Sequence, residues 1–308
     1  MRLARSGGGR LLSMMRTDLE LALRERLSFA VDLRFGTGPA RVEDRGDGVC
    51  VILTDGSTVE ADLLVGADGI HSTVRGLVFG DEPRYVRHLG LSAAAFTIDD
   101  PGLHAELGDR FVVTDTVGRQ LSLYALRGGI VAVLALYRGA HPEQPADPRS
   151  VLRERFRGVG GAVPRVLECC PPAHELYCDQ VAQVEMGIWS QGRVVLVGDA
   201  CHAVSLLSGQ GASLGIAGAY ILADQLGCAG SVDEALRRYE RIWRPVVERG
   251  QRAARGGVRW VVPESPLQLR VRRAALELAG LPGASRLAGG RLAARRLPAL
   301  GELATTTA

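Results

Sequence analysis

Residues 192–226, GRVVLVGDACHAVSLLSGQGASLGIAGAYILADQL, combine an acid at the end of an apolar run with a glycine-rich segment. Asp199 follows the run VVLVG, and a carboxylate at the end of a buried strand can accept hydrogen bonds from the hydroxyls of a ribose or ribityl chain. The glycines of SGQGA (208–212) let a flat ring or a phosphate approach the backbone, and free N–H groups at a helix start favour negative charge. The stretch therefore predicts a ligand that carries hydroxyls together with a ring or a phosphate.

A second string of polar residues, LLVGADGIHSTVR (63–75), follows another apolar run. Asp68, Ser72 and Arg75 place a carboxylate, a hydroxyl and a guanidinium near one turn at Gly69. These groups suit the polar spine of a dinucleotide, because a guanidinium pairs well with phosphate oxygens. The alternative is a capped turn that carries a surface arginine.

A sheet is needed to bring the two strings together. The runs at 39–69 and 193–199 predict strands, and DLLVGADG within the first run is apolar on both faces, as in a sheet that is covered on both sides. The glycine- and alanine-rich residues 211–226 predict a long helix that is narrow enough to pack closely on this sheet. Apolar residues at helical spacing predict further helices over 17–27 and 232–262.

Residues 84–138 differ in character, because successive strand candidates follow one another with only short turns. They predict an antiparallel sheet inserted into a parallel one. Helices are predicted over 148–159 and 164–170, and a last helix over 265–280. The strand residues of this region that could line a ligand pocket are Phe96, Phe111, Leu123, Tyr124 and Leu136.

Together, the two strings resemble the DG and GD motifs of the class A flavoprotein monooxygenases, the p-hydroxybenzoate hydroxylase type. A third, weaker match is MRTDLELAL, in which Arg16 precedes a helix start. The resemblance implies that the chain binds FAD, with NADPH or NADH as a transient reductant, and uses O2 to hydroxylate an aromatic or polyketide-like small molecule. The cofactor contacts that it implies are Arg16, Asp68, Gly69, Ser72, Arg75, Gly198, Asp199, His202, Gly209, Gln210, Gly211 and Ala212.

The same resemblance implies an α/β fold class: an incomplete Rossmann-like FAD-binding domain, an inserted antiparallel-sheet substrate domain and C-terminal helices. We expect residues 1–83, with the DG motif, and 179–262, with the GD motif, to form the FAD-binding domain. Residues 84–178 would form the substrate domain, and residues 263–308 a C-terminal helical tail.

The chain also departs from the family pattern. The family begins with a strand, a GxGxxG turn and a helix that hold the ADP half of FAD, whereas SGGGR (6–10) lacks such a setting, so we expect the first βαβ unit to be missing. Leu206 stands where the family usually has Pro, and Cys201 where Ala is usual. The alternative function is therefore an inactive fragment that cannot hold FAD alone and that forms oligomers or needs a complementing chain.

Composition narrows the other classes of function. The 308 residues carry a formal net charge of +3, which is too small to indicate nucleic-acid binding. No apolar run approaches the roughly 18 residues of a membrane span, and the start does not read as a signal peptide, so we expect a cytoplasmic chain. The six cysteines fit no zinc pattern, and no GxSxG turn supports a hydrolase. We predict no metal site, and the sequence identifies no catalytic residue.

Overall fold

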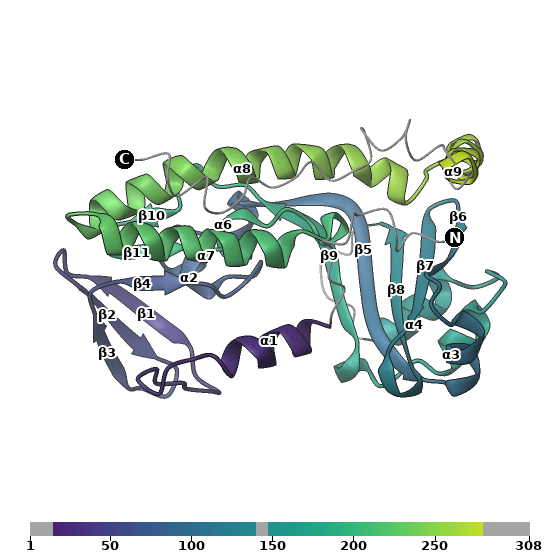
Figure 1. The fold of residues 1–308 in the computed structure, drawn as a ribbon, viewed down its shortest axis with the longest axis horizontal. Coiled ribbons are helices and arrows are strands. Elements are labelled where there is room, and N and C mark those ends of the chain that lie inside the picture. Colours follow the sequence, from purple (N-terminus) through teal and green to yellow (C-terminus); the bar gives the residue numbers. More distant parts are fainter. Residues whose placement is uncertain (1–14, 140–146, 280–308) are drawn as a thin grey trace.

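The computed structural model describes residues 15–139 and 147–279, which form two parts spanned by one long helix (Figure 1). The helices are α1 (Arg16–Arg24), α2 (Thr73–Val78), α3 (Pro101–Leu107), α4 (Pro148–Arg155), α5 (Val163–Glu168), α6 (Asp199–His202), α7 (Gly211–Cys228), α8 (Val232–Val261) and α9 (Pro266–Ala279), with the 3-10 turns η1 (Glu82–Arg84), η2 (Arg127–Gly129), η3 (Ala173–Glu175) and η4 (Leu206–Ser208). The strands are β1 (Pro39–Asp44), β2 (Val49–Leu53), β3 (Thr58–Ala61), β4 (Leu64–Gly66), β5 (Val86–Asp99), β6 (Val112–Thr116), β7 (Arg119–Ala125), β8 (Ile130–Arg138), β9 (Tyr177–Val184), β10 (Ser190–Gln191) and β11 (Val194–Leu196).

The first part contains a small mixed sheet of order β10-β11-β4, in which β11 runs parallel to β4. Its centre is β11, whose three residues are buried among side chains of α7 and α8, including Leu222 and Trp243. Beside it lies an antiparallel sheet of order β1-β2-β3 (Figure 1). Since β4 and β11 are parallel, their carboxyl ends lie at the same edge of the sheet, and the DG and GD motifs begin there.

The second part is a five-stranded antiparallel sheet of order β6-β7-β8-β5-β9. Side chains along each strand point alternately to the two faces of the sheet. Phe96 and Leu123 pack on one face in a core with α3, α4 and α5. Leu91 and Leu136 pack on the opposite face against the end of α8. The predicted inserted antiparallel sheet and the α/β fold class are confirmed. Three of the five candidate pocket residues are therefore core residues: Phe96, Leu123 and Leu136.

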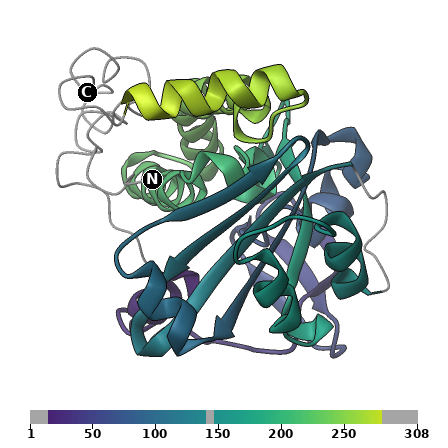
Figure 2. The same cartoon turned by 90° about the vertical axis from the view of Figure 1, so that its right-hand side faces the viewer.

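The helix α9 docks at the end of this sheet, against β6 and β7 (Figure 2). Arg272 is 8% exposed and donates to Asp115 of β6 at 2.7 Å and to Gln120 of β7 at 2.6 Å. Arg138 of β8 donates to the carbonyl oxygen of Val262, where α8 ends. These contacts fix the C-terminal helices to the second part.

One strand is less covered than its sequence predicts. Val65, in the middle of β4, is 41% exposed, because β4 is the edge strand of its sheet in the described part of the chain. The expectation that this run is covered on both sides is therefore wrong for Val65. Its pairing is as expected: Leu64, Val65 and Gly66 lie opposite Val194, Val195 and Leu196.

The predicted domain boundaries and chain ends can be compared with the described residues. The expected domain boundary after residue 178 falls inside β9, which pairs with β5 along most of its length, so the proposed division passes through a continuous strand. Residues 6–10 lie outside the described residues, as do 280–308 of the expected C-terminal tail. No helix in the described part of the chain is long and apolar enough to cross a membrane.

Candidate functional site

The DG turn is built from hydrogen bonds between its own predicted residues. The hydroxyl of Ser72 donates to Asp68 at 2.5 Å, and the same oxygen accepts from the backbone N–H of Arg75, which caps the start of α2. The other carboxylate oxygen of Asp68 accepts from the N–H of Val74 at 3.0 Å. Gly69 has φ +81°, a conformation that glycine adopts without strain. Both the acid and the hydroxyl thus shape the turn.

Arg75 joins the DG turn to the GD turn. Its side chain is fully buried and donates to the carbonyl oxygen of Ala200 at 2.8 Å and to that of Ile70 at 2.7 Å, and it pairs with Glu82 at 3.1 Å. Burial lowers the pKa of this guanidinium, and the charge of Glu82 partly opposes the effect. Ala200 follows Asp199 in α6, so the buried Arg75 holds the backbone next to Asp199 in place.

Asp199 lies at the carboxyl end of β11 and starts α6. It remains accessible to solvent, yet the protein around it desolvates the carboxylate enough to raise its pKa, and the charge of Arg16 lowers that pKa in part. The structure therefore brings Arg16 of α1 close enough to interact with Asp199, although the two residues are far apart in sequence. Gly198 has φ +60°, and a Cβ atom there would lie 3.7 Å from Gly215 of α7, so the turn and this helix pack closely.

The start of α7 lies beside Asp199. A Cβ atom on Gly211 would be 3.8 Å from a carboxylate oxygen of Asp199. The side chain of Gln210 does not cap the helix, and the first backbone N–H groups of an α-helix have no partner within the helix. Ala212 is exposed, and Gly209 adopts the left-handed conformation with φ +61°. This end of α7 therefore presents backbone donors to an anionic group.

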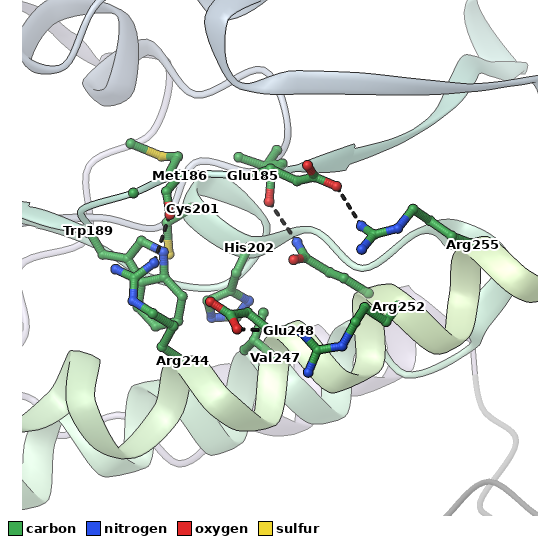
Figure 3. A pocket seen from close by; sticks show the side chains of 13 residues that line it. Glu185, Met186, Trp189, Cys201, His202, Arg244, Val247, Glu248, Arg252 and Arg255 are labelled. Carbon is green, nitrogen blue, oxygen red and sulfur yellow. Dashed lines mark hydrogen bonds and ion pairs between the residues drawn. The ribbon is translucent and has the colours of Figure 1, made fainter.

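The surface formed by Arg16, Asp199 and residues 209–212 is named the cofactor recess. His202 points toward α8 (Figure 3). It is 2% exposed, packs with its ring centroid 5.0 Å from that of Trp189, and lines a pocket of about 320 Å³ between α8 and the segment that follows β9. Its Nε2 has no hydrogen-bond partner among the described residues, and burial lowers its pKa to about 4. His202 is thus a neutral, buried ring behind the GD turn.

The segment between Asp199 and α7 holds two of the three departures from the family pattern, Cys201 and Leu206. Cys201 is fully buried, and burial raises the pKa of its thiol, so the thiol is protonated. Leu206 is 49% exposed and follows Ser205, whose φ of +123° is the single positive φ of a non-glycine residue in the described ranges. Such a conformation costs about 1–3 kcal/mol, and strained turns of this kind are concentrated at ligand sites.

The structure adds four residues to the site that the motifs did not indicate. His71 lies between Glu82 and Asp179, with a distance of 3.0 Å to each carboxylate. The hydroxyl of Tyr177 donates to Asp179 at 3.3 Å. Its pKa is raised to about 12, mainly by burial and then by Asp179. Smaller effects come from Arg16, which lowers this pKa, and from Asp199, which raises it. His71 lies within the DG string, but the sequence does not mark it as part of this cluster, because its partners Tyr177 and Asp179 come from β9, a distant part of the chain.

Comparison with known proteins gives a consistent family. The model of a family described as FAD binding domain matches residues 2–84 and 179–254. A flavin-dependent monooxygenase of Legionella longbeachae serogroup 1 (strain NSW150) is 32% identical over 248 residues, which cover 78% of this chain and 62% of that protein. The 3-amino-4-hydroxybenzoate 2-monooxygenase PtmB3 of Streptomyces platensis is 32% identical over 271 residues, covering 83% of this chain and 65% of that protein.

Among solved structures, the crystal structure of tetracycline destructase Tet(51) superposes with a TM-score of 0.68 at 30% identity, covering 81% of this chain and 66% of that chain. The chain thus spans a little under two thirds of the length of the curated relatives that it matches. The two segments matched by the family model make up just over half of the chain and contain both motifs. The chain therefore belongs to the FAD binding domain family and has the fold of the class A FAD-dependent monooxygenases.

Proposed function

We propose that this chain binds FAD at the carboxyl ends of β4 and β11 and contributes to an FAD-dependent monooxygenase reaction. The observation that carries the proposal is that Asp199 and the start of α7 meet at the carboxyl end of β11, where the charge of Arg16 also acts on Asp199. An acid that accepts from hydroxyls, a cation and unpartnered backbone N–H groups suit the ribityl chain and the pyrophosphate of FAD. The glycines of the two turns leave the backbone accessible for a close approach.

In this proposal the predicted contact residues act at two levels. Asp199, Gly209, Gln210, Gly211 and Ala212 lie at the recess and would contact the cofactor, together with Arg16. Asp68, Gly69, Ser72, Arg75, Gly198 and His202 form the two turns and hold them in place. Bound FAD would supply the redox chemistry, taking electrons from NADPH or NADH and passing oxygen from O2 to the substrate.

The five-stranded sheet would provide the substrate side of the site. Tyr177 and Asp179 alternate with Cys178, which packs in the helix-covered core, so both point to the opposite face of the sheet. Ala95 lies opposite Tyr177 in the strand register, and Leu134 and then the buried Ser122 follow on the same face. The accessible end of this row, at Tyr177 and Ala95, would face the substrate.

An aromatic or polyketide-like substrate is supported by the names of relatives, one of which acts on 3-amino-4-hydroxybenzoate. Phe111 and Tyr124 stack on each other at 6.0 Å and could contribute to the wall of such a pocket. The reductant, the substrate and a cytoplasmic location remain parts of this proposal.

The test is flavin binding by the purified 308-residue chain, before and after Asp199→Ala. We expect the wild-type chain to retain flavin absorbance after removal of excess FAD, and the variant to bind FAD at least about tenfold more weakly, because a hydrogen bond to a charged group is lost. Asp62→Asn, an exposed acid just before β4, serves as the control and should bind FAD normally. Oxidation of NADPH with consumption of O2 would then test the activity.

A colourless wild-type chain would contradict the proposal and favour the alternative, in which the chain does not hold FAD alone. Equal FAD affinity of the wild-type chain and Asp199→Ala would instead remove Asp199 from the site.

A further inference from the structure

His71 stands between two carboxylates that belong to different parts of the fold. Its Nδ1 is 3.0 Å from an oxygen of Glu82, in the turn before β5, and its Nε2 is 3.0 Å from Oδ2 of Asp179, near the start of β9. His71 itself lies in the DG turn, between Asp68 and α2. One ring thus connects the motif that shapes the proposed cofactor site with the sheet proposed to face the substrate.

Both contacts require a proton on the ring nitrogen. An ionised carboxylate only accepts hydrogen bonds, and a neutral imidazole has one N–H donor and one lone pair. Neutral His71 would therefore turn a lone pair toward either Glu82 or Asp179, whereas the doubly protonated ring donates to both. The geometry is that of an imidazolium held by two acids.

The charges around the ring favour the same form. Partial burial lowers the pKa of His71, but hydrogen bonds to Glu82 and Asp179 and their charges outweigh this and raise the pKa above its ordinary value. Glu82 and Asp179 are the charged groups that contact the ring. Each has a further partner: Glu82 pairs with Arg75, and Asp179 accepts from the hydroxyl of Tyr177. Arg16 and Asp199 lie one step further, next to Tyr177.

The same oxygen of Asp179 accepts from His71 and from the hydroxyl of Tyr177. Loss of the His71 contact would leave Asp179 with the Tyr177 hydroxyl and a backbone N–H as its partners, so that the two side chains can rearrange and the start of β9 is held by its pairing with β5 alone. Tyr177 is 47% exposed and lies within the electrostatic reach of Asp199 and Arg16. A change at His71 would reach the recess by this route, without direct contact between His71 and a ligand.

We propose that His71 is a positioning residue whose protonated ring clamps the start of β9 to the DG turn, so that the shape of the cofactor recess depends on pH. The effect on FAD rests on the proposed function, whereas the clamp does not. At low pH the ring donates to both acids and the recess is ordered. As pH rises through the raised pKa, one contact is lost, and Tyr177 and the DG turn loosen together.

The experiment compares the wild-type chain with His71→Gln, His71→Lys and His88→Gln between pH 6 and pH 8.5. Gln is neutral at every pH and donates from one side, Lys stays charged, and His88 is an exposed histidine of β5 that serves as the matched control. Two readouts are recorded: the dissociation constant of FAD by flavin fluorescence, and the intrinsic-rate-corrected hydrogen exchange of residues 177–180.

We expect wild type and His88→Gln to lose about threefold to fivefold in FAD affinity across this range, a size typical of a half-exposed ion pair. Exchange at 177–180 should accelerate in parallel. His71→Gln should bind FAD weakly, with an affinity that does not depend on pH. His71→Lys should bind FAD more tightly than His71→Gln, and its affinity should not depend on pH either. A merely structural role would lower affinity without flattening the pH profile.

The clamp would be overturned if His71→Gln kept the wild-type pH dependence of exchange at 177–180. If none of the four proteins bound FAD, the proposed function would fail, but the exchange profiles would still decide whether His71 holds β9. If the exchange profile flattened in His71→Gln while FAD affinity kept its pH dependence, the clamp would stand and its coupling to the recess would be refuted.

Discussion

Gly66, the last residue of β4, has no room for a side chain in the structure. A Cβ atom there would lie 2.5 Å from Cδ2 of Leu196 and 2.9 Å from Cβ of Val74, so it would press on both β11 and α2. We expect Gly66→Ala to lower the free energy of unfolding by about 1–3 kcal/mol, because overpacking forces neighbours out of place. Urea denaturation measures it. Gly76→Ala, in α2 with nothing within 4 Å, is the matched control and should be neutral or stabilising by up to about 1 kcal/mol.

Single residues show how far the sequence could predict the site. The spacing of Asp68 and Ser72 placed both in one turn, and the structure has them hydrogen-bonded, because local spacing determines a local turn. The sequence could not distinguish Arg75 as a buried connector from a surface residue, since its acceptor, the carbonyl of Ala200, is 125 residues away. The same limit hid His71, whose second acid, Asp179, is 108 residues distant.

At the scale of elements, Asp115 is the acid that pairs with two arginines of α9. Asp115 of β6 accepts from Arg272 and also pairs with Arg273 at 2.7 Å. Asp115→Asn should destabilise the docked helix by about 3 kcal/mol, because it leaves the guanidinium of Arg272 buried without its counter-charge. Hydrogen exchange of α9 should therefore accelerate about 100-fold or more while exchange in β11 stays slow. Arg270→Ala, which alters an exposed residue of the same helix, should leave both unchanged.

Elements were predictable where their signals are strong and continuous. The long helices α7 and α8 and the strands β7 and β8 follow their sequence runs closely. The helix α3 was not predicted, although Asp100 caps it and Pro101 occupies its first turn, because its seven residues are too short for a clear period. The strand β9 was missed for another reason: half of it is polar and reaches strand conformation by pairing with β5.

At the scale of the whole molecule, two histidines give stability opposite dependences on pH. Burial lowers the pKa of His202 to about 4 in the folded state, so the folded state binds fewer protons than the unfolded state, and stability falls as pH drops from about 6.5 to 4. The pKa of His71 is raised, so its contribution is present below about 6.5 and is lost as pH rises through the folded-state value. For these two groups together, we expect the greatest stability near pH 6.5, where neither contribution has been substantially lost.

The loss of stability at low pH, caused by His202, is larger than the loss at high pH, caused by His71. The pKa of buried His202 differs by about 2.5 units between the unfolded and folded states, which corresponds to about 3 kcal/mol of stability. Urea denaturation from pH 4 to 8 measures the profile. His202→Gln should be less dependent on pH between 6.5 and 4 by about that amount, whereas the exposed His88→Gln should follow wild type. Parallel profiles of wild type and His202→Gln would contradict a neutral, buried ring.

The buried bond from Arg75 to the carbonyl of Ala200 has a consequence for recombining this chain with its relatives. The guanidinium belongs to the DG segment and its acceptor to the GD segment, with the whole antiparallel sheet between them in sequence. A chimera that takes the two segments from different parents would keep a buried cation while changing the backbone that accepts its hydrogen bond. Crossover points should therefore be chosen so that residues 63–82, which include Glu82, and residues 194–203 are inherited together, and a sheet exchanged between them should keep an acid at the position of Asp179.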